Sequence, residues 1–239
     1  ASDTAWMDAS DRRTERLDGD AVRRLEPALR QTAGGIRFPR DARVDPRLLF
    51  RAVHVAARRA GVRFETGAAV RRILIDGDAV RGVQVEGGAE FLASTVVVAA
   101  GSWSALIDGA PIAERSVLPA RGQIVELMTP APLVEHVVMG PRCYVVPRDD
   151  GRLLVGATLE FVGHRREVTA RAVRDLVDAA IELVPALGAA SFRGTWSNFR
   201  PYTPDELPLL GRSRVRGLLL ATGHHRNGIL LARETGERV

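Results

Sequence analysis

The most promising residues for binding chemistry lie near the carboxyl end of the chain, where an apolar run leads into a polar turn. The run 218–222 predicts a buried strand that ends at Gly223, and a His-His-Arg-Asn turn at 224–227 follows it. We expect a helix to begin at Gly228 and to include Ile229 and Leu230. The free backbone N–H groups at a helix start attract anions and electron-rich ring edges. The pattern therefore predicts a ligand site at this turn, with an ordinary α/β junction as the alternative.

Two adjacent histidines, His224 and His225, raise the possibilities of a metal ligand or a general base. Neighbouring side chains in a strand or turn point in different directions, and no third ligand follows at a suitable spacing. The single cysteine, Cys143, excludes an internal disulfide and a cysteine cluster. We therefore expect no metal, and a lone cysteine is typical of a reducing cytoplasm.

Arg200 is the best candidate for binding a carboxylate. It precedes Pro201, with Trp196 and Phe199 close by, which indicates an apolar and partly buried setting. The planar guanidinium offers two parallel N–H donors that match the two oxygens of a carboxylate. The alternative is that Arg200 is one of many surface arginines.

The composition narrows the class of protein. With 239 residues, 46% of them hydrophobic and 26% charged, the chain is long enough to bury a substantial core. The longest apolar runs are too short to cross a membrane, and the polar opening at residues 1–13 lacks the apolar stretch of a signal peptide. The net charge of +5 comes from arginines that are spread along the chain and do not alternate with aromatic residues. This distribution argues against binding to nucleic acid.

The elements expected before residue 115 alternate between helix and strand. Asp45 and Pro46 predict the N-cap and first turn of a helix that ends near Gly61, and 62–66 predicts a short strand. A hairpin is expected from 70–75 and 80–85 around an Asp-Gly-Asp turn, followed by a strand at 96–100 buried on both faces. Helix followed by strand is typical of a covered parallel sheet.

The middle of the chain predicts an antiparallel sheet and one helix. Strands are expected at 123–128, 144–147 and 153–158, the last two joined by a second Asp-Gly hairpin turn. Thr169 predicts the N-cap of a helix that ends before Pro185. Residues 1–16 predict no strand, and the chain stops soon after the last expected helix start, so both ends look truncated.

The amino-acid sequence of segment 219–231, LLATGHHRNGILL, closely resembles the flavin-binding segment of glycine oxidases in the D-amino-acid-oxidase-like FAD family. The resemblance extends along the chain in the family's order. It includes 42–46, the glycine-ended strand with Gly101 at 96–104, the segment 119–123, the hairpin from 144 to 160, and the region 199–205.

The family resemblance implies a role for each matching residue. In the complete enzyme, Arg200 pairs with the substrate carboxylate and Tyr144 donates a hydrogen bond to it. Arg226 lies beside the flavin and the substrate, Leu159 shapes the pocket, and Val70 offers backbone groups to the adenine. The implied FAD-binding positions are Val70, Gly101, His224, His225, Arg226, Asn227, Gly228, Ile229 and Leu230.

The implied reaction is oxidative deamination of glycine or another small amino acid. Hydride passes from the α-carbon to noncovalent FAD, and oxygen then accepts the electrons to give peroxide. In the family this activity can feed thiazole formation for thiamine. The alternatives are a D-amino-acid dehydrogenase, an N-methyl amino acid oxidase and a non-catalytic flavin-fold remnant.

The sequence departs from the family because the fingerprint Gly-x-Gly-x-x-Gly is missing. The resemblance therefore implies a fragment without the N-terminal dinucleotide-binding unit. We expect an α/β fold in which an incomplete glutathione-reductase-type FAD lobe (31–115 and 210–239) is interleaved with an antiparallel substrate lobe (116–209), after a helical region (1–30). Such a chain is expected to bind FAD weakly by itself, and it could form a homo-oligomer or associate with the missing segment.

Overall fold

A computed structural model describes residues 14–239, and its contacts divide the chain into two compact units. Unit 1 comprises Ala1–Ala60, Gln123–Thr158 and Val168–Trp196, and unit 2 comprises Gly61–Gly122, Leu159–Glu167 and Ser197–Val239. Residues 31–60, which the sequence assigned to the partial FAD lobe, make their contacts within unit 1. The polar opening at 1–13 lies outside the described residues.

Unit 1 begins with a two-stranded antiparallel ladder of β1 (Glu15–Asp18) and β2 (Gly34–Arg37). Asp18 caps the intervening helix α2 (Gly19–Leu25) by accepting a hydrogen bond from the backbone N–H of Ala21 at 2.7 Å. The expectation of no strand in residues 1–16 is wrong, since β1 starts at Glu15. The pairing with β2, which is distant in sequence, stabilises this strand, and the local sequence does not reveal that pairing.

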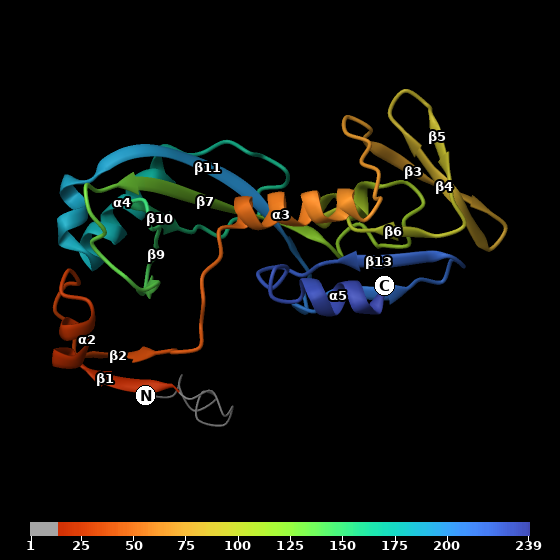
Figure 1. Cartoon of the computed structure of the whole chain (residues 1–239). Coiled ribbons are helices and arrows are strands. Elements are labelled where there is room, and N and C mark those ends of the chain that lie inside the picture. Colours follow the sequence, from red (N-terminus) through yellow and green to blue (C-terminus); the bar gives the residue numbers. More distant parts are fainter. Residues whose placement is uncertain (1–13) are drawn as a thin grey trace. The chain divides into compact units, whose positions relative to one another are not determined.

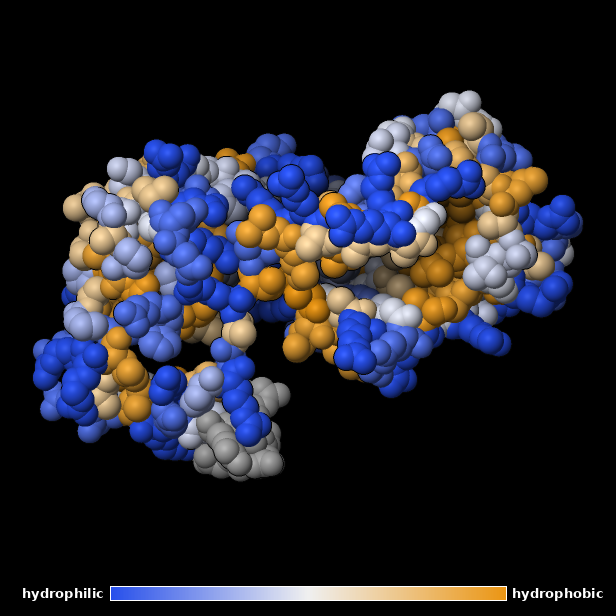
Figure 2. Space-filling model, viewed as in Figure 1, coloured by the Kyte–Doolittle hydropathy of each residue, from blue (hydrophilic) through white to orange (hydrophobic). Residues whose placement is uncertain are grey.

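Helix α3 (Pro46–Arg59) is confirmed with the expected cap, because Asp45 accepts hydrogen bonds from the N–H groups of Arg47 and Leu48. These bonds, led by that of Leu48, lower the pKa of Asp45. No residue of α3 is buried, and several of its apolar side chains, including Leu48 and Phe50, are exposed. Figure 2 shows apolar surface over this helix.

The larger of the two sheets in the described part of unit 1 is antiparallel (Figure 1). Its hairpin from β9 (Tyr144–Pro147) to β10 (Arg152–Gly156) is confirmed, with Leu153 opposite Pro147 and Gly156 opposite Tyr144. Two of its strands continue along the chain into unit 2. The strand order among the described residues is β11 (Ser191–Tyr202), β7 (Leu118–Met128), β10 (Arg152–Gly156), β9 (Tyr144–Pro147) and β8 (Val138–Met139).

The core of unit 1 lies between this sheet and helix α4 (Ala170–Leu183), followed by the short helix η2 (Pro185–Ala189). The helix is confirmed, and Thr169 caps it by accepting from the N–H of Ala172 at 3.3 Å. Leu176 and Ala180 bury the inward face of the helix against sheet residues such as Val125. Burial of this apolar surface is the main term that holds helix and sheet together.

Unit 2 contains a meander of β3 (Val70–Asp76), β4 (Ala79–Val85) and β5 (Glu90–Leu92) (Figure 1). The hairpin of the first two strands is confirmed, with Asp76 opposite Ala79 around the turn. The strand expected at 62–66 is wrong, because this segment pairs with no other strand of the described chain.

The second sheet of unit 2 places β6 (Val96–Val98) parallel to β13 (Leu218–Thr222), with β12 (Leu209–Arg212) on the far side of β13. The α/β class is therefore confirmed. Burial of β6 on both faces is wrong, since Val97 is 43% exposed. Within residues 14–239, β6 has β13 on one edge and no strand on the other. Val97 points to the opposite face of the sheet from the buried Val98, and its face is the less covered one.

The final helix, α5 (Ala232–Arg238), begins four residues later than expected. The prediction of a helix start at Gly228 is wrong, because residues 228–231 form turns, in which the N–H of Leu231 donates to the carbonyl of Asn227 at 2.8 Å. No side chain caps α5. Across the described residues, no helix is long and apolar enough to cross a membrane.

Candidate active site at the end of β13

The end of β13 meets the end of β6 through a buried hydroxyl pair. Thr222 donates a hydrogen bond to the backbone carbonyl of Gly101 at 2.9 Å and accepts one from Ser104 at 3.0 Å. Gly101 opens the short helix η1 (Gly101–Leu106), which follows β6. The structure therefore brings Gly101 next to the polar turn that the sequence singled out.

The first histidine of the turn, His224, is half-buried. Its Nε2 lies 2.9 Å from the hydroxyl of Thr235 on α5. Burial lowers the pKa of His224, because removal from water penalises the charged imidazolium. A neutral histidine bonded to a threonine hydroxyl fixes the turn against α5, and this contact ties the turn to its own unit.

The second histidine, His225, connects the turn to strand β11. Its backbone N–H donates to the carbonyl of Pro201 at 2.9 Å, and its ring packs edge-on against Tyr202 with centroids 5.1 Å apart. The residue has a φ of 46°, in the left-handed range. Its ring Nε2 is buried and has no hydrogen-bond partner in the described protein.

The charges around His225 come from three side chains of unit 2. Burial lowers the pKa of His225 most, the positive charges of Arg226 and Arg200 lower it further, and Glu206 opposes them. Two guanidinium groups therefore act on one histidine. This corner of unit 2 is electropositive and disfavours a third positive charge.

Arg200, the candidate carboxylate ligand, is half-buried on β11, which neighbours β7. Its guanidinium lies against Gly122 of β7, where an added Cβ would come within 2.5 Å of Nη1. Arg226 is exposed in the turn. The backbone hydrogen bond between His225 and Pro201 links the residue before Arg226 to the residue after Arg200.

The remaining turn residues present backbone and apolar groups. Asn227 donates its N–H to the carbonyl of His224 at 2.8 Å, which closes the turn before Gly228. Ile229 and Leu230 are 52% and 81% exposed. Exposed apolar side chains beside a polar turn fit contact with the face of a large aromatic ligand.

The other predicted positions lie elsewhere. Val70 is the first residue of β3, and Leu159 follows β10, and both are exposed residues of unit 2. Tyr144 belongs to unit 1, where it begins β9 and its ring lies over Gly156 of β10. The structure therefore brings together Gly101, the turn and Arg200 within unit 2.

An aromatic cluster in unit 2 escaped the sequence reasoning. The rings of Trp103 and His164 stack at 5.2 Å, and Phe199 meets both edge-on, with the guanidinium of Arg166 over Trp103 at 5.7 Å. The cluster joins η1, the segment 159–167 and β11 next to Arg200. The segment Gly101-Ser102-Trp103 was noticed only as a family match, and its contacts depend on residues distant in sequence.

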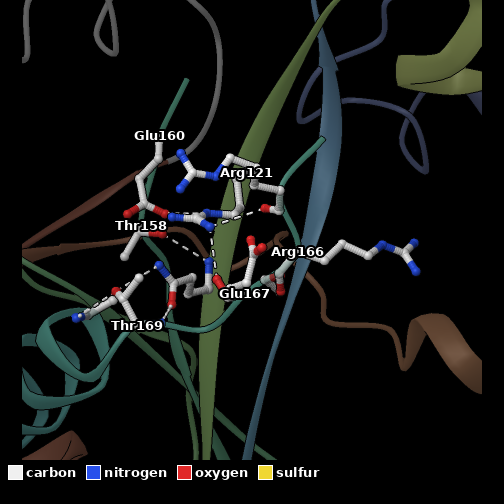
Figure 3. A network of polar contacts seen from close by, with 10 residues as sticks. Arg121, Thr158, Glu160, Arg166, Glu167 and Thr169 are labelled. Atoms are coloured by element: carbon white, nitrogen blue, oxygen red, sulfur yellow. Dashed lines mark hydrogen bonds and ion pairs between the residues drawn. The ribbon is translucent and has the colours of Figure 1, made fainter. Parts of the chain in front are cut away.

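A buried arginine is a second feature of unit 2 that the sequence did not predict (Figure 3). Arg121, 5% exposed, forms an ion pair with Glu160 at 2.9 Å and donates to the carbonyls of Arg165 and Glu167 at 3.1 and 2.8 Å. These bonds hold the loop 159–167, which carries Leu159, against β7. One signal in the sequence is that Arg121 directly follows the apolar run Leu118-Pro119-Ala120.

In unit 1, the neighbouring Gln123 performs a similar task (Figure 3). It is fully buried, its backbone N–H donates to the hydroxyl of Thr158, and its side-chain carbonyl accepts from the N–H of Thr169 at 2.8 Å. This amide therefore anchors the N-terminal end of α4 to β7.

Cys143 is buried in the core of unit 1, and burial raises the pKa of its thiol. A protonated, enclosed thiol is a poor nucleophile. Among residues 14–239, no group of three histidine, cysteine, aspartate or glutamate side chains could hold a metal.

The residues of unit 2 fit one part of FAD. The orphaned ring nitrogen of His225, the two arginines and the exposed Ile229 and Leu230 provide polar and apolar groups for a flavin edge. The sequence contains no Gly-x-Gly-x-x-Gly turn to hold the diphosphate. The chain therefore carries groups for the flavin end of the cofactor and lacks the usual diphosphate motif.

Comparison with known proteins places these features in a family. The chain is 40% identical over 222 residues to the bifunctional protein ThiO/ThiG of Synechocystis, a match that covers 90% of this chain and 33% of that protein. It is 37% identical to the glycine oxidase of Geobacillus kaustophilus, covering 91% of this chain and 58% of the oxidase. The chain thus spans between a third and three fifths of these relatives.

A solved structure agrees with the sequence matches. The crystal structure of the Geobacillus kaustophilus glycine oxidase superposes with a TM-score of 0.90 at 34% identity, covering 98% of this chain and 63% of that one. The family model described as FAD dependent oxidoreductase, DAO, matches residues 2–239. The chain therefore belongs to the DAO family of FAD dependent oxidoreductases.

Proposed function

We propose that the complete protein oxidises glycine or another small amino acid with noncovalently bound FAD and oxygen. The observation that carries this proposal is the hydrogen bond from the N–H of His225 to the carbonyl of Pro201 at 2.9 Å. It fastens the turn proposed to bind the flavin to the residue next to Arg200. A carboxylate held by Arg200 would therefore lie near the cofactor.

Among the groups of an amino-acid substrate, the carboxylate is the one for which this chain offers the clearest ligands. Arg200 presents two parallel N–H donors to it, and we propose Tyr144 as a further donor and Leu159 as a wall of the pocket. The nearby positive charge of Arg226 adds attraction for a carboxylate. The pKa of His225 is lowered by burial and by these arginines, so a neutral imidazole faces the site at neutral pH.

The chemistry that bound FAD would supply is a hydride acceptor for the α-carbon of the amino acid. Gly101 and residues 224–230 are proposed to contact the flavin, and Val70 the adenine. A small amino acid needs orientation and charge balance from the protein more than a strong base. The name of one relative, glycine oxidase, supports this choice over other oxidations.

The first experiment compares two versions of the protein. The 239-residue chain is purified beside a chain extended at its N-terminus with the dinucleotide-binding segment of its relatives. We expect flavin absorbance in stoichiometric amount only in the extended protein, and complete release of this flavin on acid precipitation. Stoichiometric flavin in the shorter chain would refute the need for the added segment, and flavin that stays on the precipitate would refute noncovalent binding.

The second experiment tests the reaction. Peroxide release is measured with glycine, sarcosine and D-alanine, and with an artificial electron acceptor in place of oxygen. The proposal predicts the highest kcat/KM for a small amino acid with oxygen as acceptor. Activity only with the artificial acceptor would identify a dehydrogenase, and flavin binding without any amino acid oxidation would favour a non-catalytic protein.

A further inference from the structure

Arg200 occupies a space that exists only because residue 122 has no side chain. A Cβ built on Gly122 would lie 2.5 Å from Nη1, 2.7 Å from Nη2 and 2.8 Å from Cζ of Arg200. Contacts below about 3 Å do not occur between carbon and such atoms, so the guanidinium and a side chain at 122 exclude each other. Gly122 is itself buried in strand β7.

The backbone at position 122 does not need glycine. Its φ lies outside the left-handed range, and it stands within an ordinary strand, where alanine is tolerated better than glycine on backbone grounds. The three nearest atoms all belong to the end of one long, flexible side chain. A methyl group at 122 would therefore displace the guanidinium of Arg200 and leave the strand in place.

We infer that Gly122 is a positioning residue that sets the carboxylate specificity of the site by seating the guanidinium of Arg200. The inference rests on the proposed function, in which Arg200 binds the substrate carboxylate. A fork of two N–H donors loses its match to a carboxylate when it shifts by about 1 Å, so occupation of this space weakens carboxylate binding. The flavin contacts and the strand pairing are unaffected.

Tyr144, the second proposed carboxylate ligand, has a similar seat within unit 1. A Cβ on Gly156 would lie 2.5 Å from both Cζ and the hydroxyl oxygen of the Tyr144 ring. The two residues are directly opposite in the pair of β9 and β10. A tyrosine over a cross-strand glycine also stabilises a sheet by itself, so the arginine seat carries the inference.

The test is Gly122→Ala in the extended, FAD-containing protein, with Gly194→Ala as control. Gly194 lies on β11, the strand of Arg200, and a Cβ there meets no atom within 4 Å. We expect Gly122→Ala to raise KM for glycine and Kd for acetate at least ~10-fold, with kcat within about twofold of the parent. Acetate binding is followed by the flavin spectrum, and thermal unfolding is measured in parallel. Unchanged KM and Kd in folded Gly122→Ala would overturn the inference.

A double-mutant cycle covers the case in which Gly122→Ala does not fold. In an Arg200→Lys background the guanidinium is absent, so the added methyl group should have little further effect on KM, acetate binding or Tm. Folding that Arg200→Lys restores supports the seat, whereas the same defect in both backgrounds overturns it. Measurements on the parent protein test the proposed function separately. A parent protein that neither oxidises amino acids nor binds acetate contradicts that function, whatever the variants do.

Discussion

Thr222 donates a hydrogen bond to the backbone carbonyl of Gly101, which joins the ends of two parallel strands inside unit 2. Thr222 is 1% exposed, and Ser104, which donates to it, is fully buried. Both partners are therefore hidden from water, and each bond replaces one that water would otherwise supply. The pair fixes the position from which the polar turn departs.

Replacement of Thr222 by valine is expected to destabilise the protein by about 1–3 kcal/mol, because it keeps the shape and leaves the Ser104 hydroxyl and the Gly101 carbonyl unpaired. Urea unfolding measures the loss. The exposed Thr66→Val serves as the control, with an expected change within about 0.5 kcal/mol. Addition of Ser104→Ala to Thr222→Val should cost less than the sum of the single changes, and strict additivity would show that the hydroxyls do not interact.

Loss of the Arg121 side chain is expected to release the loop 159–167. Arg121→Met removes an ion-pair partner of Glu160 and the Nη1 group that donates to two loop carbonyls, with an expected loss of about 3 kcal/mol. Trypsin should then cleave faster after Arg165 and Arg166 of that loop.

The matched control for the loop is Arg174→Met. Arg174 forms an exposed ion pair with Asp175, whose removal should cost at most about 0.5 kcal/mol and leave cleavage unchanged. Equal effects of the Arg121 and Arg174 substitutions on stability and cleavage would contradict a clamping role for Arg121.

The charges near His225 predict a specific titration. Since Arg226 contributes to the lowered pKa of His225, Arg226→Gln should raise that pKa toward its ordinary value of 6.5, while burial keeps it below. NMR titration of the histidine rings gives the measurement. His224 is an internal control, because burial alone lowers its pKa and it should not respond.

The lowered histidine pKa values also fix the sign of a pH effect on stability. Between the lowered pKa in the folded protein and about 6.5, the unfolded chain binds more protons than the folded chain. The two histidines therefore cost no stability above about pH 6.5, and the free energy of unfolding falls as the pH drops through this window. His225→Asn, which tolerates the positive φ, should reduce the loss on acidification, and a loss equal to that of the parent would exclude a contribution from His225.

The elements with strong local signals could be predicted from the sequence. Asp45 and Pro46 define the start of α3, Thr169 defines the start of α4, and the turn at Gly77 defines the first hairpin. These features depend on neighbours within a few residues. The start of α5 was wrong by four residues, because turns and helices share their first hydrogen bonds and local sequence does not separate them.

Features that depend on distant pairing could not be predicted. The strand β1 exists through its ladder with β2, and the exposure of Val97 depends on what covers its face of the sheet. In the candidate site, the polar turn and Arg200 were proposed from the sequence, and the bond between His225 and Pro201 links these two segments. The seat at Gly122 was missed, because a glycine in a strand gives no sign of the side chain that fills its space.

The most direct test of the account is the response of KM for glycine to Arg200→Met in the extended, FAD-containing protein. Loss of a half-buried charged ligand should raise KM about 100-fold or more, while flavin binding and Tm stay near the parent values. Arg193→Met, an exposed change on the same strand, should leave KM unchanged. A KM for glycine in Arg200→Met equal to that of the parent would show that another group binds the carboxylate.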